Sequence, residues 1–353
     1  MRKLGILIGA LIGVVVFEQP SSAQSPEPVF LFFQRTIESL RAEAAIPGMS
    51  GAILQDGQVV WQWADGRQDV EASIAARPDT PYVIGALSQA VGSTLLLRKC
   101  IDQSYADVGD LVVRWSPTYP EASATIANLL SHAAPDGTFH YDPARLSALT
   151  DVIEQCTTQR YARLLVDEVF DRLAMINAVP GHALSTPTAE DLTLFEPARL
   201  ARYADTLRRV AIPYRVINRR ATRNTDLVPA RLDIARGIVA SALDLAQFDS
   251  ALDTGLLLSP DTRVQALSQA FAGGKPLPTG LGWFVQEYNR EPIAWQFGVV
   301  DGAYSSLIVK IPNRKLTMIL LANSDGLSAP FAADGRDVTA SIFAATFLRA
   351  FVP

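Results

Sequence analysis

The spacing of apolar residues predicts an amphipathic helix over residues 29–45, ending at the helix breaker Pro47-Gly48. The helix-spaced apolar positions are Phe33, Ile37, Leu40 and Ala44. Two β-rich segments follow, residues 49–55 and 58–64. Asp56-Gly57 between them suits a two-residue hairpin turn because both residues tolerate positive φ.

The rest of the chain divides into a helical middle and a strand-rich end. Patterns typical of helices cover residues 85–101, 145–156, 160–173, 194–207 and 242–252. Apolar or β-rich runs separated by short turns cover residues 281–288, 293–297, 304–311 and 316–322, and a last helix is expected over residues 338–351. Strands at both ends around a helical middle predict an α+β fold in which one antiparallel sheet, flanked by helices, joins the two ends of the chain.

The N-terminus carries the pattern of a secretory signal peptide over residues 1–23. Arg2 and Lys3 precede an uncharged apolar run from Leu4 to Phe17, and small residues follow at Ser21-Ser22-Ala23. The alternative is a membrane anchor, but this run is shorter than the ~20 residues that span a bilayer. We therefore expect a mature chain in the bacterial periplasm with no stable membrane anchor.

The mature chain is expected to form one domain over residues 24–353. Its sheet subdomain would comprise about residues 24–84 and 256–353, and its mostly helical subdomain about residues 85–255. With 49% hydrophobic and 19% charged residues, the chain can bury a large core, which excludes long disordered architectures.

Charge argues against nucleic acid as a partner. The formal charge is −5, and because residues 1–23 contribute +1 (Arg2, Lys3, Glu18), the mature chain carries −5 − 1 = −6. Arginine nevertheless concentrates in one segment, at positions 208, 209, 215, 219, 220 and 223. This cluster is either a site for acidic partners, such as peptidoglycan carboxylates or anionic lipid headgroups, or a solvated loop or helix face paired with acidic residues.

Cys100 and Cys156 are the only two cysteines, so an oxidising compartment permits one disulfide between them, and two separately buried thiols are the alternative.

The three histidines, His132, His140 and His182, match no common zinc-ligand spacing, and no phosphate-binding glycine loop is present. We therefore expect no metal and no cofactor, and a structural role for His132 at a helix end.

Several segments, in order along the chain, resemble the serine β-lactamase and penicillin-binding-protein superfamily, in particular the class C-like branch that includes D-amino-acid carboxypeptidases and esterases. The resemblance implies the same α+β architecture, with the active cleft between the sheet and the helical subdomain. The segments are Ile46-Pro47-Gly48-Met49, Thr80-Pro81-Tyr82-Val83-Ile84-Gly85, Thr125-Ile126-Ala127-Asn128-Leu129-Leu130-Ser131-His132, Gly280-Leu281-Gly282-Trp283-Phe284 and Leu320-Leu321-Ala322-Asn323-Ser324-Asp325.

The family's reaction requires a serine nucleophile and a lysine three residues later on the same helix face. Here the corresponding positions are Ala86 and Gln89, which supply neither a nucleophile nor a base near neutral pH. A shifted alignment does not restore the pair, because Ser88 is followed three residues later by a valine and Ser93 by a leucine. None of the four lysines after residue 23 follows a serine at this spacing; they are Lys99, Lys275, Lys310 and Lys315.

The second family motif, Tyr-x-Asn, is matched by Tyr141-Asp142-Pro143, which keeps the tyrosine and loses the asparagine. Tyr141 is thus the retained catalytic side chain, or else a tyrosine that packs at a helix start. In the third motif Gln296 replaces the basic residue, and Gly298 would let a ligand approach the strand closely. By resemblance, the oxyanion hole would use the backbone N–H groups of Ala86 and Val299.

The sequence therefore predicts an exported β-lactamase-related protein whose catalytic motifs are degenerate and whose cleft binds a small acyl, peptide-like or peptidoglycan-like ligand. The expected ligand-binding set is Ala86, Gln89, Tyr141, Gln296, Gly298 and Val299. One alternative is a weak hydrolase of ester or amide bonds, including β-lactams and D-amino-acid peptides, that uses Tyr141 or Ser88. The other is a cell-envelope scaffold, which would present a large apolar surface patch.

Overall fold

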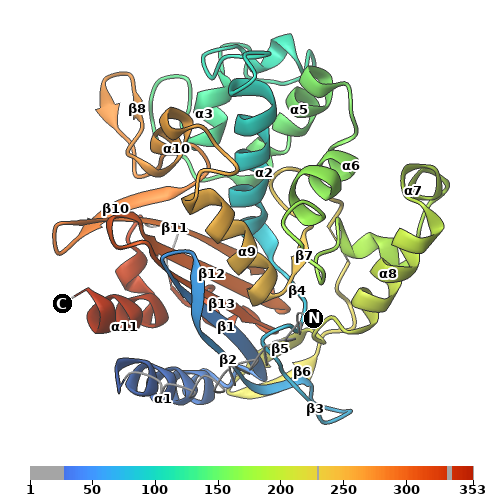
Figure 1. Cartoon of the computed structure of the whole chain (residues 1–353), viewed down its shortest axis with the longest axis vertical. Helices are drawn as coiled ribbons and strands as arrows, with labels where there is room; N and C mark the ends of the chain where they lie inside the picture. The colour runs from blue at the N-terminus through green and yellow to red at the C-terminus, as the bar shows by residue number, and fades with distance from the viewer. Residues whose placement is uncertain (1–27, 229, 332–335, 353) are drawn as a thin grey trace, which may run out of the picture.

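A seven-stranded antiparallel sheet runs through the middle of the molecule (Figure 1). The computed structural model describes residues 28–228, 230–331 and 336–352, so the expected signal peptide lies outside the described residues. The sheet order is β10-β11-β12-β13-β1-β2-β3, which places strands from the two ends of the chain side by side. The strands are β1 Gly48–Gln55, β2 Gln58–Asp69, β3 Ile74–Ala75, β10 Phe284–Tyr288, β11 Glu291–Val300, β12 Tyr304–Ile311 and β13 Leu316–Ala322.

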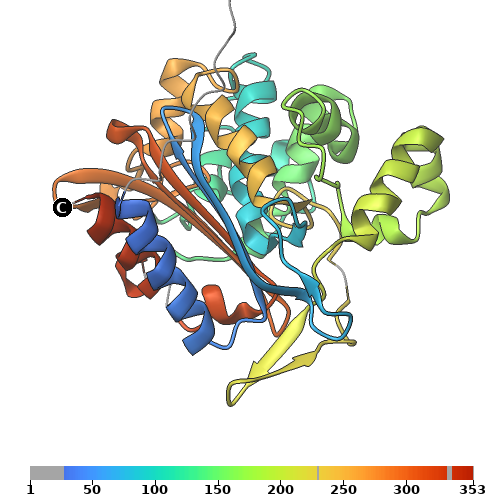
Figure 2. The ribbon, with the colours of Figure 1, turned by 60° about the horizontal axis from the view of Figure 1, so that its bottom comes forward.

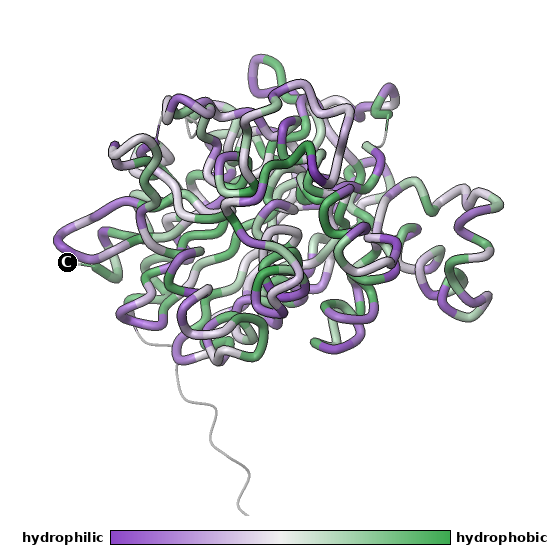
Figure 3. Tube along the Cα trace, turned by 90° about the horizontal axis from the view of Figure 1, so that it is seen from above, coloured by the Kyte–Doolittle hydropathy of each residue, from purple (hydrophilic) through white to green (hydrophobic). Residues whose placement is uncertain are grey.

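The central strands are buried on both faces, which explains why they are mostly apolar in the sequence. The buried polar exceptions in β12 and β13 are Ser305, Ser306, Lys310 and Thr317. Every residue of β12 and β13 is buried. Along β13, Met318 and Leu320 face one core cluster, whereas Ile319 and Leu321 face the other. This alternation follows from the two-residue period of a strand, and Figure 3 displays the hydropathy along the trace.

Helices cover both faces of the sheet (Figures 1 and 2). On one face, α1 (Pro28–Glu43) and α11 (Ile342–Phe351) contribute Phe33, Ile37, Phe343 and Phe347 to a shared core. On the other face lie α2 (Ser88–Leu96) and α9 (Ala242–Asp253). The predicted α+β architecture, with one antiparallel sheet formed by both ends of the chain, is therefore confirmed.

The remaining helices form the region between the two groups of strands. They are η1 Gly85–Leu87, η2 Leu97–Ile101, η3 Val112–Arg114, α3 Ile126–Leu130, α4 Pro143–Leu146, α5 Leu149–Thr157, α6 Tyr161–Leu165, η4 Val166–Phe170, η5 His182–Ser185, α7 Ala189–Leu194, α8 Pro197–Arg208 and α10 Pro260–Leu267. Short one-turn helices η6 Pro312–Arg314, η7 Asp325–Leu327 and η9 Val338–Ala340 lie among the C-terminal elements. None of the helices in the described residues is both long and apolar enough to cross a bilayer.

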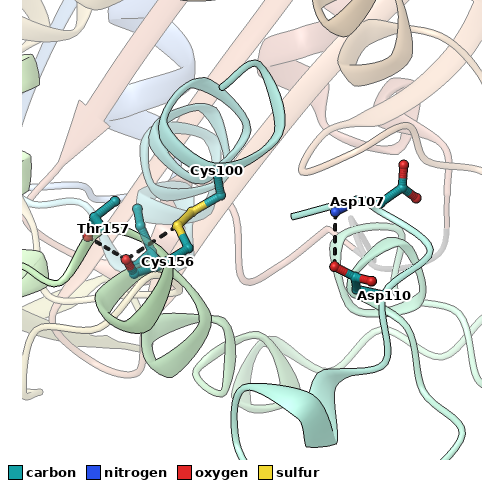
Figure 4. Close-up of a disulfide and its surroundings, with 6 residues drawn as sticks. Cys100, Asp107, Asp110, Cys156 and Thr157 are labelled. Carbon is teal, nitrogen blue, oxygen red and sulfur yellow. Dashed lines mark hydrogen bonds between the residues drawn. A yellow bond between two sulfur atoms is a disulfide. The ribbon is translucent and has the colours of Figure 1, made fainter. Parts of the chain in front are cut away.

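A disulfide joins Cys100 in η2 to Cys156 in α5 (Figure 4). The Cα atoms of these cysteines are 6.0 Å apart, and the bond closes a separation of 56 residues. On the chain-entropy model, a closed loop of this size stabilises a fold by about 4 kcal/mol.

The arginine-rich segment differs from the expectation of a helix face or a loop, because much of it is a β-hairpin. Strand β5 (Tyr214–Ile217) pairs with β6 (Arg220–Arg223) across a two-residue turn at Asn218 and Arg219, which have φ of 50° and 62°. Asparagine tolerates this left-handed conformation, and polar residues alternate with Tyr214 and Val216, as is typical of a strand. Two further strand pairs are short: β4 Tyr82–Val83 with β7 Val239–Ala240, and β8 Phe271–Ala272 with β9 Lys275–Pro276.

Candidate functional site

The turn that contains Ala86 packs against the free edge of β11. Strand β10 begins opposite Trp295, so the continuation of β11 is paired only with β12 and presents its other edge to η1. Gly85 has φ of +56°, and a Cβ built on it would lie 3.2 Å from both the backbone N and O of Val299. A glycine is therefore required here, both for its conformation and for its contact with the strand.

Ala86 is the exception in a buried segment. Among residues 80–97, all of which the structure describes, it alone is partly exposed. No side chain caps the start of η1, and the first N–H groups of a helix have no acceptor within the helix. The methyl group of Ala86 thus borders solvent beside backbone N–H groups at a helix start.

A pocket of about 270 Å³ opens beside Ala86. Val299 and Pro143 line it as well, so residues from the three expected motifs meet around one cavity. Its remaining walls are mostly apolar, formed by Val83, Leu227, Val228, Ala230, Ala235 and Val300.

His182 and Arg236 contribute the polar side chains of this pocket, and the sequence analysis assigned neither to the site. The Nδ1 atom of His182 is buried without a hydrogen-bond partner among the described residues, and burial lowers the pKa of the imidazole, which favours its neutral form. Arg236 pairs through Nε with Asp233 at 3.1 Å and is half exposed. Sequence offered no motif for either residue, since each lies in a segment that only the fold brings to Ala86.

Gln89 lies deeper, in contact with His132. The Asp142 N–H donates to His132 Nδ1 at 3.4 Å, so the ring proton resides on Nε2, which donates to Gln89 Oε1 at 3.0 Å. Burial, followed by the nearby charge of Arg145, lowers the pKa of His132 to about 3. The imidazole is therefore neutral at physiological pH, and its role is to hold the amide of Gln89 in place.

Tyr141 packs in an aromatic cluster beside the same histidine. Its ring centroid lies 4.7 Å from that of His132, 5.4 Å from that of Phe284 and 5.5 Å from that of Phe297. The tyrosine is half buried and is held by packing on several sides. This position is compatible with both sequence interpretations, a retained catalytic phenol and a packing residue.

The side chain of Gln296 is engaged by the backbone. Its Nε2 donates to the Gly282 carbonyl at 3.2 Å, and its Oε1 accepts from the Phe297 N–H at 2.9 Å. The residue is buried, and it is not among the residues that line the pocket beside Ala86. Ala86 and Val299 thus line the pocket, whereas Gln89, Tyr141 and Gln296 are not among its lining residues.

Gly298 has a different role from the expected one. A Cβ at this position would lie 2.1 Å from the Ile84 carbonyl oxygen and 2.9 Å from the Leu87 backbone N. The space beside Gly298 is therefore occupied by the turn that contains Ala86. The glycine allows β11 and this turn to pack closely, and it leaves no room there for a ligand.

Ser88, the alternative nucleophile, is fully buried and its hydroxyl is already engaged. It donates to the Gly85 carbonyl at 2.7 Å and accepts from the Ile238 N–H at 3.3 Å. The site also offers no metal-ligand cluster, since the described residues contain no group of three or more His, Cys, Asp or Glu side chains able to hold an ion.

A beta-lactamase family model matches residues 33–341. Three solved structures share the fold. The octameric penicillin-binding protein homologue from Pyrococcus abyssi has a TM-score of 0.69 at 18% identity, covering 91% of this chain and 77% of its own. The class C beta lactamase from Rhodobacter sphaeroides has a TM-score of 0.67 at 17% identity, and the match covers 91% of this chain and 99% of that one. The D-amino acid amidase from Ochrobactrum anthropi has a TM-score of 0.68 at 15% identity, and the match covers 90% of this chain and 99% of that one. No curated protein sequence matches significantly.

Proposed function

Because this chain belongs to the beta-lactamase family, we propose that it is an exported member which has lost acylation chemistry and binds a small carboxylate-bearing acyl or peptide-like ligand beside Ala86. The observation that carries the proposal is the pocket of about 270 Å³ that the methyl group of Ala86 borders at the start of η1. By the resemblance of its sequence motif, this alanine corresponds to the position of the family's serine nucleophile.

Loss of covalent chemistry follows from the two substituted side chains. A methyl group cannot attack a carbonyl, and the amide of Gln89 cannot accept a proton near neutral pH. In a serine protease, loss of the nucleophile alone costs about 10⁶ in turnover. The buried hydroxyl of Ser88 donates to one backbone group and accepts from another, so it offers little as a substitute.

The groups around the pocket favour a small ligand with an anionic end. By family resemblance, the N–H groups of Ala86 and Val299 would bind a carboxylate or carbonyl oxygen, and the Arg236 guanidinium supplies a positive charge at the same cavity. Apolar walls such as Leu227 and Val300 suit an acyl or hydrophobic side chain. The volume is at the lower limit for drug-sized ligands, which favours a small molecule.

A weak hydrolase is the second candidate, and one observation favours it. The ring of Tyr141 lies beside that of His132 in a tilted arrangement, and His132 Nε2–H donates to Gln89, so a phenol, an imidazole and the residue at the family's base position are contiguous. This arrangement would require the phenol to reach a substrate held in the pocket.

Incubation of the mature protein with a labelled penicillin and a chromogenic ester separates the candidates. We expect no covalent mass addition and no turnover, together with thermal stabilisation by small N-acyl amino acids or D-amino-acid dipeptides. Ala86→Phe fills the mouth of the pocket and should abolish that stabilisation without unfolding the chain, since Ala86 is partly exposed. Acylation or turnover that Tyr141→Phe or Ser88→Ala removes would establish the hydrolase instead, and a co-purifying envelope protein without either effect would establish the scaffold.

A further inference from the structure

The β5–β6 hairpin projects from the body of the protein (Figure 2, yellow). Its base is fixed, because the ring of Tyr214 is buried and its hydroxyl donates to Glu71, while its N–H donates to the Asn323 carbonyl at 2.9 Å. Beyond this base, every residue from Ile217 to Arg223 is exposed. A rigid base and an exposed end are the features of a segment that contacts something outside the protein.

Four arginines of this hairpin, at positions 215, 219, 220 and 223, are free of ion pairs and of side-chain hydrogen bonds within the described part of the chain. The two neighbouring arginines behave differently. Arg208 and Arg209 both pair with Asp205, at 2.7 and 4.0 Å. The alternative in which the whole cluster neutralises acidic residues of the same chain therefore applies to its first two members and not to the hairpin.

The strand register places positive charge and an apolar side chain on the same face. Arg215 lies opposite Thr222, and Ile217 lies opposite Arg220, so these four residues share one side of the hairpin. Ile217 is 61% exposed at the end of this face. The face is concave, with a cavity of about 490 Å³ between the hairpin and the following residues, among which Asp226 contributes a single carboxylate.

We propose that the β5–β6 hairpin is a contact surface for an anionic phospholipid bilayer, with headgroup phosphates entering the concave arginine face and Ile217 reaching the interfacial region. A guanidinium group can bind two oxygens of one phosphate at once. An exposed aliphatic side chain beside such groups can be buried at the boundary between the headgroups and the acyl chains. This contact is reversible and peripheral, unlike a membrane anchor.

The charge of the hairpin is complementary to an anionic bilayer. The rest of the molecule is acidic, so the electrostatic attraction to such a bilayer would have to come from the hairpin. With a net charge of −6 after residue 23, the mature chain as a whole is repelled by an anionic surface. Binding would therefore depend on the local cluster and impose one orientation on the protein. Each arginine near an anionic bilayer contributes about fivefold to the partition coefficient, which corresponds to about 1 kcal/mol.

The test is sedimentation of the chain from residue 24 with vesicles of phosphatidylcholine containing 30% phosphatidylglycerol, compared with phosphatidylcholine alone. Residues 1–23 are omitted because their apolar run would itself enter a bilayer. The variant Arg219→Gln/Arg220→Gln/Arg223→Gln should bind the anionic vesicles about 100-fold more weakly. A matched variant, Arg35→Gln/Arg290→Gln/Arg349→Gln, changes the net charge equally at exposed arginines outside the hairpin and should remain within about threefold of the parent.

Binding by the parent should also weaken steeply as salt rises, since the attraction is electrostatic. Ile217→Ser should reduce the binding that persists at high salt. Equal binding by both triple variants, or no preference of the parent for anionic vesicles, would overturn the proposal. So would saturation by millimolar glycerol phosphate in the absence of a bilayer, or tighter binding to duplex RNA than to vesicles. Unchanged circular dichroism and melting temperature of the hairpin variant exclude a folding defect as the cause.

Discussion

Lys310 on β12 and Asp249 on α9 form an ion pair of 2.8 Å in which neither side chain is exposed to solvent. Asp253, one helical turn further, also contacts the ammonium at 2.7 Å, and Thr317 accepts a hydrogen bond from it at 3.1 Å. This cluster links α9 to the sheet. Lys310, one of the four lysines that follow residue 23, therefore has a structural role, because its ammonium is held by these three side chains.

Lys310→Met should destabilise the protein by about 3–5 kcal/mol, because it leaves the buried carboxylate of Asp249 and the partly buried carboxylate of Asp253 without their cation. Burial already raises the pKa of Asp249, with Lys310 opposing that effect, so removing the lysine takes away the main stabilisation of the charged form. Urea unfolding measures the loss. Adding Asp249→Leu in the same chain should recover part of it, and a single variant as stable as the parent would contradict this account.

Ala86→Ser combined with Gln89→Lys should partly restore acylation by a labelled penicillin, whereas Ala86→Ser alone should not. The introduced lysine meets an obstacle, because His132 receives the Asp142 N–H at Nδ1 and so presents an N–H, not an acceptor, towards position 89. We therefore expect a lower melting temperature in the double variant. Complete inertness of a folded double variant would indicate that the pocket no longer admits the family's substrates.

Arg236→Gln should weaken binding of a carboxylate ligand beside Ala86 about tenfold or more, which is the range for hydrogen bonds to charged groups. The loop should stay in place, since Asp233 keeps its hydrogen bonds from Ser147 at 2.9 Å and from the Ala235 N–H at 2.8 Å. Calorimetric titration measures the effect. Arg231→Gln, an exposed arginine of the same loop, is the matched control, and an equal loss in both variants would remove Arg236 from the site.

His132 should make the protein sensitive to mild acid. Its pKa in the folded state is about 3, below the ordinary value of 6.5. Between pH 3 and pH 6.5 the histidine is therefore protonated in the unfolded chain but not in the folded one. Stability from this group is full above pH 6.5 and falls by up to about 1.4 kcal/mol for each unit as the pH drops towards 3. His132→Phe should flatten the decline in melting temperature between pH 7 and 4.5, and an unchanged slope would show that the imidazole is not buried in its neutral form.

Sequence patterns predicted the architecture well because its central elements have simple periodicities. The runs at 304–311 and 316–322 became β12 and β13 with those bounds, since strands buried on both faces are mostly apolar. The Asp56-Gly57 turn likewise has the positive φ values, 53° and 75°, that its composition indicates.

The site was only partly predictable, for a physical reason. Ala86 and Val299 lie in motifs with fixed spacing, whereas His182, at the start of η5, and Arg236, in a loop, reach the pocket along paths that depend on packing far along the chain. Gly298 illustrates the same limit: the sequence indicated the close approach of a ligand there, whereas in the fold the Ile84 carbonyl occupies that space.

The contact between the Ala86 turn and β11 separates the shape of this site from its chemistry. Gly85 and Gly298 set the backbone geometry through their close contacts with Val299 and with the Ile84 carbonyl, and neither contact involves the side chains at positions 86 and 89. Under the proposed function, a lineage that abandons catalysis keeps a formed pocket, and substitutions of single side chains around it can change which ligand binds.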